Sequence, residues 1–138
     1  MKVIGVDYGE ARTGVAVSDA TGVLARGIET IFSKDMVKTA EQVARHAENE
    51  GAELIVVGLP KNMDGSMGFR AEATMRFAEV LGGLINIEIK MRDERLTTVS
   101  ATRILDEVNV RGMARKNIID KMSATVILQE YLDSVLRP

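Results

Sequence analysis

The chain has no cysteine and only one histidine among its 138 residues. Without cysteine it can form neither a disulfide framework nor a thiolate metal site, so a metal ion would have to bind oxygen atoms or His46. Oxygen ligands favour hard cations such as Mg²⁺ or Mn²⁺. His46 itself lies among alanines on an expected helix, which favours packing or surface exposure over a catalytic role.

Long apolar runs and an excess of positive charge are also missing. No stretch approaches the length of a membrane span, and the apolar N-terminal run is interrupted at Asp7, so we expect a cytoplasmic protein without a signal peptide or membrane contact. The formal net charge of −2 argues against coating nucleic acid by bulk charge but leaves local basic patches open. Aromatic residues make up only 4%, with Tyr8 alone expected near the site below, so base stacking is expected to be secondary to recognition of backbone and shape.

The residues that are present predict one α/β domain over residues 1–138. Apolar content is 46%, and the periodicity alternates between strand-like and helix-like segments. The expected strands are 1–8, 14–19, 23–32, 52–60 and 85–94, and the expected helices are 35–50, one marked by Ala71, Met75, Ala78 and Leu81, one from Thr97 or Thr98 to Glu107, and one from about 116 to 136. This order, βββαβαβαα, is that of an RNase H-like fold, a five-stranded mixed sheet of an antiparallel meander and parallel strands, flanked by helices.

Acidic residues occur on separate elements that this fold would bring to one edge of the sheet. Asp7 ends the first strand, Asp93 and Glu94 end the last strand, and Asp120 interrupts an apolar stretch of the final helix. Each alone has an ordinary structural explanation, such as a turn or a solvated surface. Together they would repel one another without a cation, which favours a metal site beyond the carboxyl ends of the parallel strands.

Four blocks carry a specific resemblance. "DYGEARTGVAVSD" at 7–19, "GLPKNMDGS" at 58–66, "DERLTT" at 93–98 and "IDKMSATVILQEYLD" at 119–133 resemble the signature blocks of the YqgF family, whose members are described as Holliday junction resolvases and as nucleases maturing the 5′ end of 16S ribosomal RNA. The resemblance covers essentially the whole chain. It implies an RNase H-like nuclease with Asp7, Glu94 and Asp120 as the acidic triad, and Asp93 as the less favoured partner.

Phosphodiester hydrolysis fits these acids. A two-metal mechanism needs carboxylates that bridge and flank ions about 3.5–4 Å apart, so we expect Asp7 to bridge two Mg²⁺ or Mn²⁺ ions and Glu94 and Asp120 to hold their outer sides. Arg12 could bind a phosphate oxygen, or it could pair with Glu10 or Asp19.

Basic residues near the expected site predict a nucleic-acid track, although a solvated charged loop remains the alternative. The expected contacts besides Arg12 are Lys61, Arg70, Arg111, Arg115 and Lys116.

The fourth strand lacks the acid that many RNase H-like nucleases place at its end, and has Gly58 there instead. If this strand lies between the first and the last, Glu94 begins two strand spacings from Asp7, about 10 Å, and Gly58 would leave space for its side chain to reach across. The alternative is that Gly58 is needed for a positive φ.

The substrate remains open between precursor 16S rRNA and branched DNA. RNA is favoured weakly, because symmetric cutting of a junction calls for a two-fold dimer and no apolar stripe for one is evident, which leaves a monomer or a weak homodimer. Two other classes stay possible: a nucleotide-binding protein of the actin and sugar-kinase type, which "DYGEARTG" also resembles, and a non-catalytic binding module on the same fold.

Overall fold

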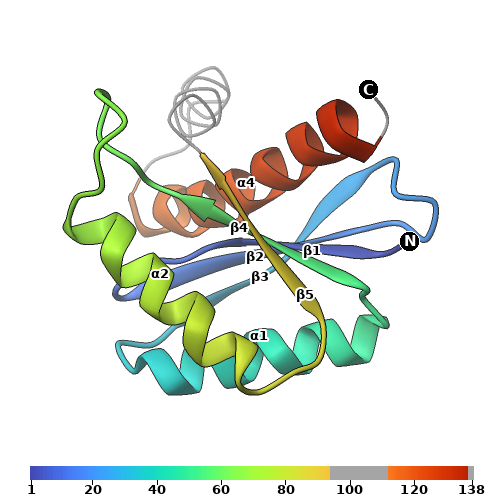
Figure 1. The fold of residues 1–138 in the computed structure, drawn as a ribbon, viewed down its shortest axis with the longest axis horizontal. Helices are drawn as coiled ribbons and strands as arrows, with labels where there is room; N and C mark the ends of the chain where they lie inside the picture. The colour runs from blue at the N-terminus through green and yellow to red at the C-terminus, as the bar shows by residue number, and fades with distance from the viewer. Residues whose placement is uncertain (94–111, 137–138) are drawn as a thin grey trace.

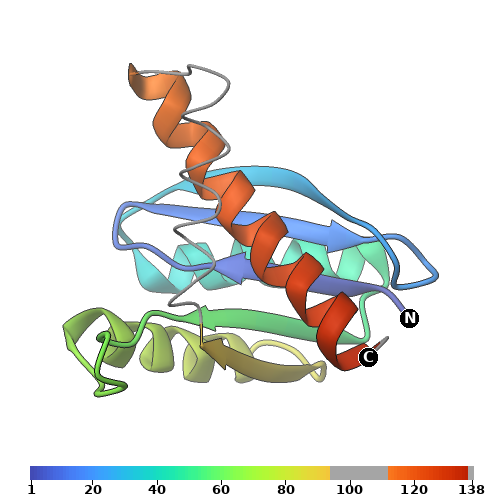
Figure 2. The same ribbon diagram turned by 90° about the horizontal axis from the view of Figure 1, so that it is seen from above.

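The computed structural model describes residues 1–93 and 112–136, with side chains from residue 121 onward in the second range. Figures 1 and 2 show a twisted sheet between two layers of helices. The elements are β1 (Val3–Asp7), β2 (Arg12–Ser18), β3 (Ala25–Phe32), α1 (Met36–Glu50), β4 (Leu54–Leu59), α2 (Phe69–Gly82), β5 (Glu88–Asp93), α4 (Gly112–Tyr131) and the π-helical segment η1 (Leu132–Leu136).

The five strands lie in the order β3-β2-β1-β4-β5. Strands β1, β2 and β3 form an antiparallel meander, whereas β4 pairs in parallel with β1 and β5 pairs in parallel with β4. The predicted fold class is therefore confirmed, and so are the central position of β1 and the place of β4 between β1 and β5.

Most strand boundaries differ from the sequence prediction by one or two residues, two elements begin three or four residues from the predicted position, and one element falls outside the description. Strand β5 begins at Glu88 rather than at 85, because its pairing starts opposite Leu54, the first residue of β4. Helix α4 begins at Gly112 rather than near 116, since residues 113–116 are all strong helix formers. The helix expected from Thr97 or Thr98 to Glu107 lies outside the described residues.

Helix α1 has the predicted boundaries for identifiable reasons. The Asp35 side chain accepts hydrogen bonds from the backbone N–H groups of Val37 and Lys38, at 3.0 and 3.2 Å. At the other end Gly51 has φ 68°, and its N–H bonds back to the last turn. The helix is thus capped at both ends by residues suited to those conformations.

Helices α1 and α2 cover one face of the sheet and α4 covers the other (Figure 2). Strand β4 is buried along its whole length, as its continuous apolar sequence predicts. In α2, however, the predicted apolar stripe is partly wrong, because Met75 is exposed while Thr74 and Phe77 are buried with Ala71 and Leu81. The Thr74 hydroxyl donates to the Arg70 carbonyl at 2.9 Å, so its burial leaves no polar group unpaired.

Small residues let α4 lie directly on the sheet. Gly5, Ala16 and Gly27 are paired across β1, β2 and β3. A Cβ atom on Gly5 would lie 2.7 Å from Leu128 Cβ and 3.0 Å from the Ala124 carbonyl oxygen. Ala124 of α4 and Gly5 of β1 thus both allow this close packing.

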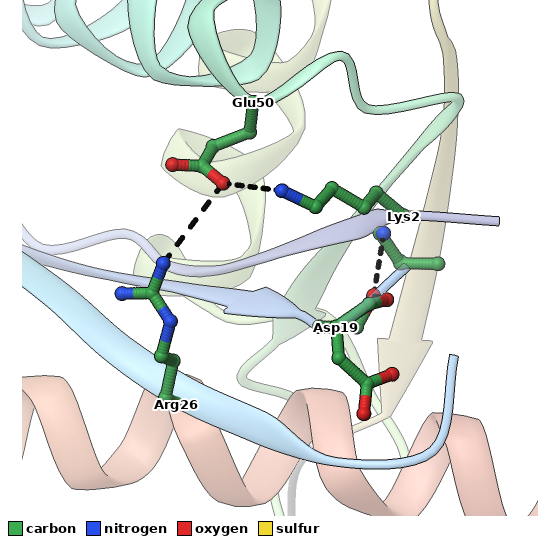
Figure 3. A network of polar contacts seen from close by, with 6 residues as sticks. Lys2, Asp19, Arg26 and Glu50 are labelled. Carbon is green, nitrogen blue, oxygen red and sulfur yellow. Dashed lines mark hydrogen bonds and ion pairs between the residues drawn. The ribbon is translucent and has the colours of Figure 1, made fainter. Parts of the chain in front are cut away.

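A polar network secures the end of the sheet where the chain begins (Figure 3). Lys2 Nζ lies 2.9 Å from Glu50 Oε1, and Arg26 lies 4.0 Å from the same oxygen. The N-terminal amino group donates to the Ala20 carbonyl at 2.8 Å. These contacts join the start of β1 to β3 and to the end of α1. Over the described residues, the helices are too short or too polar to cross a membrane.

Candidate active site

Asp7 is the last residue of the central strand and is half-buried. The preceding residues on its face, Val3 and Gly5, lie under α4, so alternation along the strand puts Asp7 on that face. Helix α4 crosses this face of the sheet obliquely (Figure 2), with Ala124 and Leu128 against Gly5 of β1 and Lys121 against Gly27 of β3. Asp120 belongs to this helix and directly precedes Lys121.

Glycines flank Asp7 on both neighbouring strands. Asp7 pairs with Gly14 of β2. On the other side Val6 pairs with Val57, so Gly58 is the residue next to Asp7, and Gly58 pairs in turn with Arg92. One cross-strand row of the sheet thus consists of Gly14, Asp7, Gly58 and Arg92. In this row the Asp7 carboxylate has a glycine, which has no side chain, on each neighbouring strand.

The alternative explanation for Gly58, a positive φ, is wrong. Within the described part of the chain, the glycines with positive φ are Gly22, Gly51 and Gly65. The position of Gly58 beside Asp7 is consistent with the prediction that it leaves space for a longer side chain to reach across. The side chain in that prediction, Glu94, lies outside the described residues.

The turn from β1 to β2 is held by its own backbone and one threonine. The N–H of Gly9 donates to Thr13 Oγ1 at 3.3 Å, and the Thr13 hydroxyl donates to the Gly9 carbonyl at 3.4 Å. A Cβ on Gly9 would lie 2.2 Å from the Arg12 carbonyl oxygen, which backbone atoms could not accommodate without moving. The absence of a side chain at Gly9 therefore allows the turn to close, which sets the position of Arg12, the first residue of β2, relative to Asp7.

A cavity of about 270 Å³ opens at this turn. It is lined by the consecutive residues from Asp7 to Arg12 and by Arg70 of α2. One of the predicted pairings of Arg12 is wrong: Asp19 follows the far end of β2 and accepts hydrogen bonds from Thr21 and Val23. Two guanidinium groups therefore border the cavity that contains Asp7.

Arg92 is a further cation near this end of the sheet, on the α4 face. Its guanidinium lies 4.0 Å from Glu130, and its buried Nε has no hydrogen-bond partner among the described residues. Asp93, one residue further, is exposed and falls on the opposite face by alternation.

The other predicted site residues are placed in part or not at all. Lys61 is half-buried in the loop after β4 and lines neither of the cavities described here. Asp120, Arg115 and Lys116 lie on the backbone of α4, with side chains outside the description, whereas Glu94 and Arg111 lie wholly outside the described residues. Among the side chains that are described, no three acidic or histidine residues come together as metal ligands.

A second cavity, of about 330 Å³, adjoins the first and was not predicted. Both cavities are lined by Tyr8, Gly9, Glu10 and Arg70. The second is completed by Lys34, Met36, Phe69, Ala73, Thr74 and Arg76. The expectation that Tyr8 is the only aromatic residue near the site is wrong, because Phe69 is far from Asp7 in sequence but lines this adjoining cavity.

Tyr8 is part of the wall between the cavity and the core. Its ring stacks on Phe77 with centroids 4.4 Å apart. Burial raises the pKa of the Tyr8 hydroxyl above 10.0, the negative charge of Glu10 raises it further, and Arg76 opposes both. Tyr8 therefore stays protonated at neutral pH.

This fold, with an aspartate ending its central strand, defines a protein of the RNase H-like class. A family model described as RuvX, Holliday junction resolvase, matches residues 1–134, and the chain belongs to this family of nucleases, which is also called YqgF. A Clostridium novyi protein named "Putative pre-16S rRNA nuclease" is 45% identical over 135 residues, which cover 98% of this chain and all of that one.

Solved structures agree on the fold. Thermus thermophilus RuvC has a TM-score of 0.60 at 11% identity and covers 96% of each chain. The fowlpox virus resolvase, solved with Holliday junction DNA, has a TM-score of 0.56 at 14% identity and covers 99% of each chain.

Proposed function

We propose that this nuclease hydrolyses phosphodiester bonds with the help of Mg²⁺ or Mn²⁺ and matures the 5′ end of precursor 16S rRNA. The observation that carries the proposal is the position of Asp7. Its carboxylate ends the central strand, lies between two glycines and lines a cavity that two arginines border. This arrangement offers an oxygen ligand, open space and counter-charge for a phosphate at one point of the sheet edge.

Asp7, Glu94 and Asp120 are the proposed ligands. Asp7 fits a divalent cation, because carboxylate oxygens are preferred ligands of Mg²⁺ and Mn²⁺ and the flanking positions carry no side chains. Glu94 directly follows β5, and Asp120 belongs to α4, the helix that packs on the face of β1 that carries Asp7. When bound, two such ions supply an activated water and stabilise charge on the leaving oxygen.

The cations of the site would bind and orient the substrate. Arg12 and Arg70 border the Asp7 cavity, where a guanidinium can contact two oxygens of one phosphate. Lys61, Arg111, Arg115 and Lys116 are proposed to extend the track along the nucleic acid backbone. Their contribution would be independent of base sequence and sensitive to salt.

Precursor rRNA is preferred because a relative with 45% identity over its whole length carries that name. Branched DNA is the second candidate, and the family description favours it. The sequence analysis favoured RNA over branched DNA because no apolar surface for a dimer was evident, but the structure has an apolar surface that removes this argument. An open apolar groove of about 350 Å³ lies between α2 and β5, lined by Met75, Ala78, Glu79, Gly82, Ile87, Ile89 and Met91.

The test is cleavage of precursor 16S rRNA and of a synthetic four-way junction side by side, with Mg²⁺ or Mn²⁺ and with each metal removed by chelation. We expect metal-dependent cleavage of the RNA at its 5′ side. Asp7→Asn should lower the rate at least about a hundredfold, equal to about 2.7 kcal/mol on the barrier. Asp133→Asn, an exposed aspartate on η1, is the matched control and should cleave normally.

Cleavage of the junction alone, by a protein that sediments as a dimer, would support the second candidate instead. Undiminished cleavage by Asp7→Asn would refute the proposed site. Equal activity in chelator and in Mg²⁺ would refute the role of the metal.

A further inference from the structure

The second cavity combines an exposed aromatic ring with a surplus of positive charge. Phe69 is 74% exposed, although a phenylalanine is more usually buried. Lys34, Arg70 and Arg76 line the same cavity, and Glu10 is its single acidic residue. A ligand suited to this lining carries negative charge and a flat apolar face.

The size of the cavity also fits an organic ligand. Its volume of about 330 Å³ lies within the range of about 300–1,000 Å³ that small-molecule sites occupy. One wall is rigid, because the Tyr8 ring is fixed by stacking on Phe77 and Thr74 is bonded to its own helix. Phe69 stands at the first residue of α2, where its ring is free to meet a ligand face.

The loop that leads to Phe69 is held in one conformation. Asn62 N–H donates to the Ser66 carbonyl at 3.0 Å, and Asp64 accepts from both the N–H and the hydroxyl of Ser66 at 2.9 and 2.6 Å. A Cβ on Gly68 would lie 3.0 Å from the Asn62 side chain, so the loop packs closely against the residue before Phe69. The aromatic ring is thus presented from a pre-organised support.

The position of the cavity identifies the ligand. It shares Tyr8, Gly9, Glu10 and Arg70 with the cavity of Asp7, so a chain with its phosphate at Asp7 would continue past Arg70 toward Phe69. A base inside a duplex has both faces covered by its neighbours and could not stack on Phe69. A base outside a duplex could, and such stacking is a common mode of binding single strands.

We propose that the cavity lined by Tyr8, Phe69 and Arg76 binds an unpaired nucleotide next to the phosphate that is cleaved. Phe69 stacks on the base, while Lys34 and Arg76 contact the sugar-phosphate backbone on that side. This inference rests on the proposed nuclease function and narrows its substrate to nucleic acid with an unpaired segment at the cleavage site. A precursor 5′ end outside a helix has that form.

The test measures binding without cleavage, in Asp7→Asn protein and without divalent metal. One probe is an RNA hairpin with an unpaired 5′ extension that contains 2-aminopurine, and the other is the same hairpin without the extension. We expect at least about tenfold tighter binding of the extended hairpin, with quenching of 2-aminopurine by stacking. Phe69→Ala should bring the two affinities within about twofold, and Phe69→Trp should restore the difference.

Two further variants complete the design. Leu24→Ala truncates another exposed apolar side chain, 65% exposed and at the opposite end of the sheet, and should leave the preference unchanged. Arg76→Gln should weaken binding and reduce the slope of log affinity against log salt by about 1.

Retention of the full preference by Phe69→Ala would overturn the proposal, and so would equal binding of both hairpins by the Asp7→Asn protein. Binding of free nucleoside 5′-monophosphate as tightly as the extended hairpin would also overturn it, because the cavity would then be a small-molecule site. The binding measurements do not depend on cleavage. Absence of cleavage by the wild-type protein would refute the nuclease proposal, whereas the two hairpin affinities alone decide whether the cavity binds an unpaired nucleotide.

Discussion

Replacing Gly5 by alanine should disturb both stability and catalysis, because this residue sets the distance between β1 and α4. The added Cβ would lie 2.7 Å from Leu128 Cβ and 3.5 Å from Leu128 Cα, and 3.0 Å from the Ala124 carbonyl oxygen. Carbon atoms pack best at about 3.5–4.0 Å, so the helix must move away by about 1 Å. None of these atoms is the flexible end of a side chain, so rotation about a side-chain bond cannot relieve the contact.

The expected cost in folding free energy is about 1–3 kcal/mol, the usual penalty for overpacking a core. The effect on cleavage should be larger than stability alone explains, because α4 carries Asp120, one of the proposed metal ligands. A displacement of about 1 Å between catalytic groups can lower a rate by about a hundredfold. At a temperature where the variant is fully folded, we therefore expect a large fall in kcat with a smaller change in substrate affinity.

The measurements are urea unfolding followed by circular dichroism, and single-turnover cleavage. Gly82→Ala is the matched control, because its Cβ would meet only Ile89 Cδ1 at an ordinary 3.7 Å. Adding Leu128→Ala should not rescue Gly5→Ala, because alanine keeps the Cβ atom that the new methyl group would meet and the substitution also removes a fully buried side chain. Wild-type stability and rate in Gly5→Ala would refute the close-packing argument.

Three further substitutions test separate features. Gly9→Ala should abolish most cleavage, measured at saturating metal, because its Cβ would lie 2.2 Å from the Arg12 carbonyl oxygen and the turn beside Asp7 must open. Asp35→Ala should lower unfolding free energy by about 1 kcal/mol in a denaturant titration and leave cleavage intact, as expected for loss of an N-cap. The hydrogen bond from Lys2 lowers the pKa of Glu50 below 4.5, with burial opposing, so its stabilisation is present above that value and lost as pH falls below it. Glu50→Gln should accordingly show a flatter loss of stability in acid melts, and an unchanged acid profile would contradict the pair.

The sequence predicted the elements of this fold well where the signal is local. The order of the strands and helices and the extent of α1 each follow from the local periodicity of the sequence. The buried face of α2 was predicted less well, because hydropathy alone favours Met75 over Thr74. Thr74 can be buried because its hydroxyl bonds to its own helix, a compensation that no apolar count reveals.

In the candidate site, too, local features are predictable from sequence and long-range features are not. Asp7 stands out as a charge at the end of a buried strand, so sequence alone identifies it. The row that joins Asp7 to Gly58 and Arg92 depends on the register of β1, β4 and β5, which is a long-range property. Phe69 was missed for a related reason: it is 62 positions from Asp7 along the chain, and only the fold brings α2 beside the first turn.

The glycines of β1, β2 and the turn between them each have a different structural role around Asp7. Gly5 admits α4 on the strand surface, Gly9 allows the turn to close against Arg12, and Gly14 leaves the position beside the carboxylate without a side chain. These residues lose more conformational entropy on folding than others would, so their use in the central strands weakens the fold locally. That cost falls at the end of the central strand, where Gly5 lets α4 pack closely on the sheet and Gly14 leaves space beside Asp7 for the metal ions that we propose.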